Sequence, residues 1–134
     1  MSTPKDFKAL SVYFERLVDL MWLGRWRIRF VCGPTDIMEN GVPAAAHNEI
    51  GPNSLEVTVT VSEAWPTWER DYLRRTLVHE LVHCHMEVFH RAHDVIQPVL
   101  SSEVWKVYDE QLRRIMEQTV EAIAVSWADR LPLP

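Results

Sequence analysis

Apolar positions change their period along the chain, and each period predicts a different element. Between residues 5 and 22 apolar side chains recur at helical spacing, which predicts an amphipathic helix closed by Gly24. Residues 25–31, Arg-Trp-Arg-Ile-Arg-Phe-Val, alternate between apolar and basic side chains, as is typical of a half-buried strand. Residues 32–43 are rich in Gly, Pro, Asp and Asn, which predicts a loop.

The next two segments have the pattern of a strand hairpin. Residues 44–50 and 55–61 flank the sequence Gly-Pro-Asn-Ser, which favours a turn at residues 51–54. In the second segment apolar residues alternate strictly with Glu and Thr, and this is the clearest strand pattern in the chain. The apolar residues of this strand are Leu55, Val57, Val59 and Val61.

After the hairpin the period becomes helical again. Residues 67–97 contain neither Gly nor Pro, and Pro98 is expected to end this helix near Gln97. Ser101 resembles an N-cap, from which a second long helix can run to about Arg130. The order predicts an α+β fold with an N-terminal helix, a small, mostly antiparallel three-stranded sheet and two long helices.

Composition and charge indicate a globular protein and argue against nucleic-acid-binding and membrane-spanning classes. The chain has 134 residues, 47% hydrophobic and 25% charged, which predicts one globular domain spanning residues 1–134. With a net charge of -5 and scattered Lys and Arg, we expect no nucleic-acid binding. No apolar run approaches the ~20 residues of a membrane span, and the N-terminus lacks a signal-peptide pattern. We therefore expect a cytoplasmic protein that binds no membrane.

Residues 79–83, His-Glu-Leu-Val-His, form an HExxH motif inside the first long helix. Histidines four positions apart lie on one helix face, so both imidazoles can reach one ion. Imidazole suits zinc, which lowers the pKa of a bound water to about 7. The motif predicts His79 and His83 as zinc ligands and Glu80 as the general base that takes a proton from that water. The alternative interpretation is a helix that is merely rich in histidine.

The later histidines of this helix fit the third ligand position poorly. On an unbroken helix His90 lies about 10 Å and His93 about 15 Å beyond His83 along the axis, and His85 points to a different face. A glycine could break the helix and bring one of them back, but the chain has no glycine after Gly51. We expect these three histidines to be surface or packing residues.

The second long helix offers a carboxylate instead. If the two helices pack antiparallel, equal rises from the turn place residue 83 level with about residue 116. Glu117 is the glutamate nearest that level, and we predict it as the third metal ligand. Glu121, one turn further, could accept a hydrogen bond from the free ring nitrogen of a ligand histidine. Both glutamates could instead be solvated helix charges.

These residues resemble the gluzincins, in which a glutamate on the next helix completes the HExxH site and an acidic residue four positions later supports a histidine. The chain looks most like compact metallopeptidase-like proteins of phages and prophages, through Thr-Leu-Val-His-Glu-Leu-Val-His and Glu-Gln-Thr-Val-Glu-Ala-Ile-Ala. The resemblance covers about half the chain, from residue 55 onward. It implies a minimal zincin-like fold whose strand 55–61 is the sheet edge beside the site, where an extended peptide could add.

Three hypotheses follow from these observations. The first is a zinc-dependent peptidase that hydrolyses a peptide bond in a protein or peptide substrate. The second is a zinc-binding interaction module with the same fold and no turnover, because no Tyr or His stands out as a transition-state donor. The third is an SprT-like site with His93 in place of Glu117. The substrate and the oligomeric state stay open.

Overall fold

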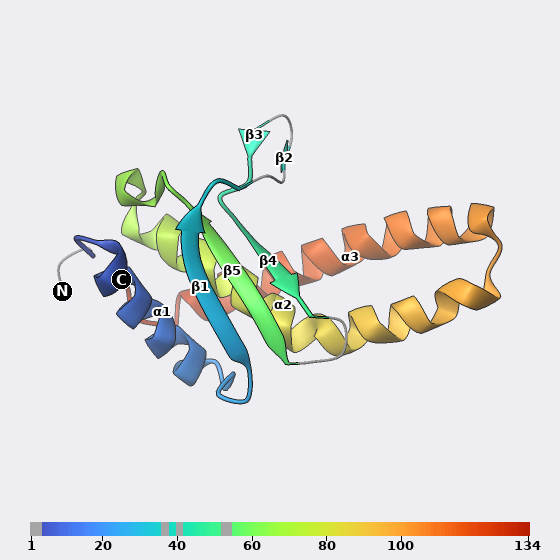
Figure 1. Ribbon diagram of the computed structural model, residues 1–134, viewed down its shortest axis with the longest axis horizontal. Helices are drawn as coiled ribbons and strands as arrows, with labels where there is room; N and C mark the ends of the chain where they lie inside the picture. Colours follow the sequence, from blue (N-terminus) through green and yellow to red (C-terminus); the bar gives the residue numbers. More distant parts are fainter. Residues whose placement is uncertain (1–3, 36–37, 40–41, 52–54) are drawn as a thin grey trace.

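The fold is α+β, as the sequence predicts. The computed structural model describes residues 4–35, 38–39, 42–51 and 55–134. A first helix is followed by a small sheet and then by two long helices that form an antiparallel hairpin (Figure 1). Among the described residues, no helix is long and apolar enough to cross a membrane.

Helix α1 spans Phe7–Leu20, with Asp6 as its N-cap: the Asp6 carboxylate accepts a hydrogen bond from the Ala9 amide at 2.8 Å. At its C-terminus the amide of Leu23 donates to the Val18 carbonyl, the closing bond of a Schellman motif. Trp22 occupies the position of that motif where the backbone is left-handed, with φ of 61°. The helix is therefore closed by Trp22 and not by Gly24, so the expected closing residue was wrong.

The main sheet has three strands in the order β1 (Arg27–Gly33), β5 (Glu56–Ser62) and β4 (Ala46–Ile50). Strands β4 and β5 pair antiparallel, as predicted for the hairpin, although residues 52–54 of the predicted turn lie outside the described residues. Strand β1 pairs parallel with β5, so the sheet is mixed. After β1 the chain crosses to form β4 at the far side of the sheet, and it then returns to form β5 between β1 and β4. The alternation of side chains within a strand does not predict this order.

The position of the sheet edge corrects one expectation. The strand at 55–61 was expected to be the edge beside the site, but β5 lies between β1 and β4. Strand β4 is the edge on the side of the two long helices. The predicted loop at 32–43 also contains two short strands, β2 (Met38–Glu39) and β3 (Val42–Pro43), which pair antiparallel.

The two long helices match their predicted bounds closely. Helix α2 spans Arg70–Ile96 after a 3-10 turn at Trp65–Thr67, and a second 3-10 turn, Gln97–Val99, which contains Pro98, follows its end. Helix α3 spans Ser102–Ala128, and the Ser101 hydroxyl accepts a hydrogen bond from the Val104 amide at 3.3 Å. The turn end of this hairpin projects beyond the sheet (Figure 1), and we call residues 86–112 the arm.

The core lies between one face of the sheet and helices α1, α2 and α3. Inward residues of β5 meet apolar residues of α1 and α2, and the Phe14 ring stacks on Phe30 of β1 with centroids 4.1 Å apart. The packing anchors the first half of α2, so the HExxH motif stands on a rigid part of the molecule. The most deeply buried core residues include Leu10, Leu17, Val59, Leu77, Leu81 and Val120.

Candidate metal centre

Helix α2 presents His79 and His83 from the end of its buried first half. The motif lies in unbroken helix, and the two histidines are one turn apart. Their Nε2 atoms lie 3.3 Å apart, with side chains 22% and 11% exposed. The two rings therefore converge on one point at the bottom of an open hollow.

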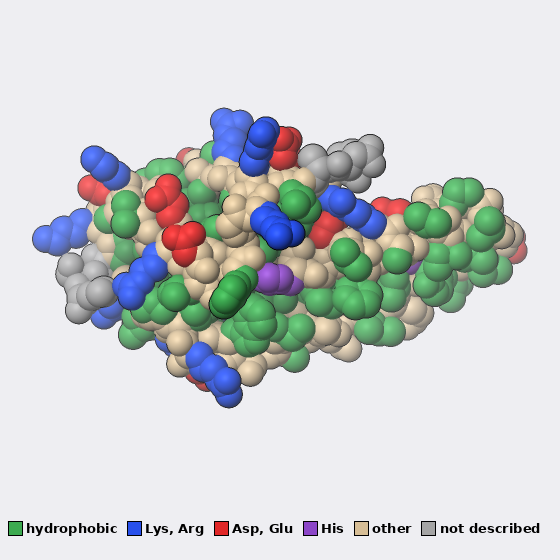
Figure 2. All heavy atoms as spheres, turned by 90° about the horizontal axis from the view of Figure 1, so that it is seen from below, with side chains coloured by type: hydrophobic (Ala, Val, Ile, Leu, Met, Phe, Trp, Pro, Cys, Tyr) green, Lys and Arg blue, Asp and Glu red, His purple; other side chains and the backbone are tan. Residues whose placement is uncertain are grey.

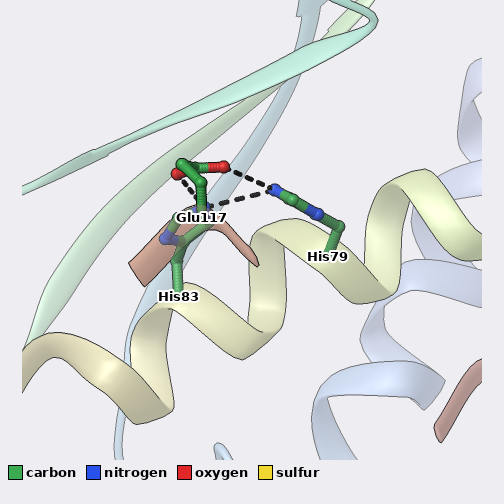
Figure 3. Close-up of side chains that lie close together, drawn as sticks. All are labelled: His79, His83 and Glu117. Carbon is green, nitrogen blue, oxygen red and sulfur yellow. Dashed lines mark hydrogen bonds and ion pairs between the residues drawn. The ribbon is translucent and has the colours of Figure 1, made fainter. Parts of the chain in front are cut away.

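Glu117 of α3 completes this group, as counting from the helix turn predicted. Its Oε1 atom lies 3.2 Å from Nε2 of His83, and its Oε2 atom lies 3.5 Å from Nε2 of His79 (Figure 3). One donor atom from each of the three side chains lies within 4.8 Å of the others. The antiparallel packing of α2 on α3 thus brings together residues far apart in sequence.

The spacing of these donor atoms fits a tetrahedral zinc ion. At bond lengths of roughly 2.0–2.1 Å, two ligand atoms of a tetrahedral site lie about 3.3 Å apart. The two Nε2 atoms lie 3.3 Å apart, close to that value. Each of them also lies near one oxygen of Glu117, Nε2 of His83 at 3.2 Å from Oε1 and Nε2 of His79 at 3.5 Å from Oε2, so the carboxylate faces both imidazoles. Two imidazoles, one carboxylate and an open fourth position also form a known ligand set of catalytic zinc.

Glu121 orients one of these imidazoles. Its Oε2 atom lies 2.8 Å from Nδ1 of His79 and accepts a hydrogen bond from that nitrogen. With Nδ1 holding a proton, Nε2 is the nitrogen whose lone pair can bind a metal. The sequence placed Glu121 in this role, and the structure brings the two side chains together.

Electrostatics favours opposite charges within the group. Burial lowers the pKa of His79, but the hydrogen bond to Glu117, with Glu80 and Glu121 nearby, outweighs burial and raises it to about 9. Hydrogen bonds from His79 and His83 hold the pKa of the Glu117 carboxyl well below its usual range. A metal bound at this position must therefore displace a proton from His79.

Glu80 lies beside the group and is 6% exposed. Burial raises the pKa of its carboxyl above the ordinary value, although the nearby His79 and His83 oppose that shift. Its Oε2 atom accepts a hydrogen bond of 2.6 Å from Nδ2 of Asn48, on the edge strand β4. Asn48 therefore fixes the buried carboxylate, and it also ties the sheet edge to the HExxH helix.

Two hollows meet at this group and are bordered by β4. The first lies toward the arm and includes His79, Glu80, His83 and Glu117; its other polar lining residues are His47, Asn48, Glu87, His90, His93, Asp94 and Arg113. The second lies toward the start of α2, shares His79, Glu80 and Glu117, and is lined elsewhere by Ala45, Tyr72, Ala122 and Val125. Together they form a groove beside β4, the edge strand of the sheet in the described part of the chain.

The remaining histidines of α2 lie outside the group. Nε2 of His85 donates to the Met21 carbonyl at 2.7 Å, which ties α2 to the end of α1. His93 is 5% exposed, contacts Asp109 at 2.9 Å and stacks on Trp105. His90 lines the first hollow, with its ring centroid 6.4 Å from that of His83. His93, the alternative third ligand, is thus held by other partners.

Asn48 is the site residue that sequence reasoning missed. The predicted hairpin included it, but neither the strand pattern nor the motif indicated which edge would face the helix. Tyr72, seven positions before His79, was also not singled out, although it lines the second hollow. No pattern in the sequence marked either residue.

Comparisons of the chain with protein-family models, with curated proteins and with solved structures found no match. The function is therefore inferred from the geometry and chemistry of the site.

Proposed function

We propose that the chain is a zinc-dependent peptidase. His79, His83 and Glu117 would hold the ion, and Glu121 would orient His79. The observation that carries this proposal is the convergence of two Nε2 atoms, 3.3 Å apart, on the carboxylate of Glu117, in a group where Glu121 sets the tautomer of His79. A bound zinc ion would act as a Lewis acid and lower the pKa of a water ligand to about 7.

Glu80 would act as the general base. Its carboxylate adjoins the metal group and is held by Asn48, and burial raises its pKa toward the range useful for proton transfer. It would take a proton from the attacking water and pass it to the amine that leaves when the peptide bond breaks. This transfer of a proton from water to a leaving amine is the one that hydrolysis of a peptide bond requires.

The groove supports an extended peptide as the substrate. Strand β4 borders both hollows and lies at the edge of the sheet formed by the described residues. An extended chain can hydrogen-bond to such an edge, and its alternate side chains would then enter the flanking hollows. This assigns to β4 the peptide-binding role that the family resemblance gave to the strand at 55–61.

The test separates metal binding from catalysis. Glu80→Gln removes the base but none of the three ligands, so it should abolish cleavage of a peptide library while zinc stays near one equivalent per chain. The control is Glu49→Gln, an exposed glutamate on the other face of β4. If the wild type binds zinc and cleaves nothing, the site belongs to a zinc-binding interaction module without turnover.

A further inference from the structure

The apolar face of α2 continues past the body of the molecule. Within the body this face packs in the core, where Leu77, Leu81 and Cys84 are 0%, 0% and 3% exposed. On the arm the same face carries Val88, Ala92 and Val95, and Val99 follows in the 3-10 turn after α2. We call these four residues the arm stripe. Its three valines are 70%, 76% and 76% exposed, and Ala92 is also exposed. The apolar face that packs in the core is therefore exposed to solvent along the arm, up to the 3-10 turn at the end of α2.

Nothing in the described part of the chain covers the arm stripe. Figure 2 shows this side of the molecule, with hydrophobic side chains gathered along the arm and charged side chains mostly at its margins. Soluble monomers rarely expose a large contiguous apolar patch unless it binds something. Phe89, 57% exposed, lies beside the stripe and widens it.

An exposed tryptophan lies next to the contact between the end of α1 and α2, at His85, three positions before the arm stripe begins. Trp22 is 90% exposed and follows Met21, whose carbonyl is bonded by His85 of α2. It adopts φ of 61°, a conformation that favours Gly or Asn and is unusual for a bulky side chain. An indole kept in water and in this conformation contributes little to the fold, but it would contribute much to an interface.

The spacing of the arm stripe favours a second copy of the chain. Consecutive stripe residues are four, three and four positions apart, the spacing by which paired helices interlock their side chains. This spacing reads the same in both directions, so a twofold axis would pair Val88 with the partner's Val99 and Ala92 with the partner's Val95. No charged residue belongs to the stripe itself.

The exposed area suits such a dimer. Phe and Trp side chains each bury on the order of 150–250 Å², and the three exposed valines of the stripe add to the area that Phe89 and Trp22 present. A stable interface buries about 800 Å² on each partner. We propose that the chain forms a twofold dimer through antiparallel contact of the two arm stripes, with each Trp22 covering the arm tip of the other copy.

The test is the mass of the full-length protein in solution. We expect a dimer by sedimentation or light scattering that dissociates on dilution between about 100 and 1 µM. Val95→Glu should raise the dissociation constant at least tenfold, because it places two charges in the seam. The matched control, Val12→Glu, changes a valine 62% exposed on α1 and should leave the dimer intact.

A second variant separates the interface from the fold. Trp22→Asn should weaken the dimer while leaving the thermal midpoint of the monomer equal or higher, since Asn accepts this backbone conformation. Zinc content should stay unchanged in all three variants, because the stripe contains none of the metal group. A wild type that is monomeric at 100 µM, or that binds lipid vesicles as a monomer, overturns the proposal. So does a dimer that is indifferent to Val95→Glu.

Discussion

His79 has the most demanding environment of any single residue in the site. Its two ring nitrogens face two different glutamates, Glu117 at 3.5 Å and Glu121 at 2.8 Å. One glutamate would share the metal, while the other fixes the tautomer. Glu121 contacts His79 but is not itself a proposed metal ligand. Its carboxylate can therefore be removed by mutation while all three proposed ligands stay in place.

Glu121→Ala should weaken zinc binding by about 10- to 100-fold without abolishing it, because the ring of His79 loses the acceptor that orients it. Competition with a chromophoric chelator measures the change. Gln118→Ala, an exposed neighbour on α3, serves as the control and should bind zinc as the wild type does. Equal affinity for Glu121→Ala and the control would show that the contact has no supporting role.

The raised pKa of His79 predicts a pH dependence in protein stripped of metal by a chelator. A pKa raised from 6.5 to about 9 stabilises the folded state fully below pH 6.5, and this stabilisation is lost as the pH rises toward 9. The thermal midpoint should fall across that window, and His79→Gln should flatten the fall. Zinc affinity should rise over the same window, because fewer protons compete. A midpoint that rises with pH contradicts the assignment.

Most residues of the candidate site could be predicted from the sequence. HExxH spacing located His79, Glu80 and His83, and the helix turn set the level of Glu117 and Glu121. The contact of Asn48 with Glu80 could not be predicted, because it depends on which strand lies at the edge. That choice is made by long-range pairing, whereas the other contacts follow from helical periodicity and one short turn.

Among the elements, the α2–α3 hairpin is the best determined by the sequence. Pro98 and the Ser101 cap fix where the two helices end and begin, and the equal rise of the helices fixes which residues face each other. The sheet is less determined, because a strand pattern reveals alternation but not the partner or its direction. Both the parallel β1 pairing and the edge position of β4 depend on that missing information.

The link between β4 and α2 gives a prediction at the scale of elements. Asn48→Ala leaves the buried carboxyl of Glu80 without its donor, so we expect the free energy of unfolding to fall by about 1.5–3 kcal/mol. Urea denaturation measures this loss. Glu49→Ala, exposed on the same strand, should change it by less than about 0.5 kcal/mol. A loss of similar size in both variants would mean that the bond adds no specific stability.

For the molecule as a whole, metal binding and folding should be coupled. The three proposed ligands come from two helices whose relative position exists only in the folded chain. Zinc at 100 times its dissociation constant should therefore add about 2.7 kcal/mol to the free energy of unfolding. Thermal scans with zinc and with a chelator measure the shift. Magnesium, which prefers oxygen ligands, should leave the midpoint unchanged.

The central claim is that zinc is held by His79, His83 and Glu117, and the metal content of purified variants tests it most directly. After dialysis, elemental analysis should find about one zinc per chain in the wild type and in His93→Ala, and far less in Glu117→Ala. Loss of zinc in His93→Ala with retention in Glu117→Ala would contradict the ligand set. A wild-type chain that holds no zinc would contradict the claim altogether.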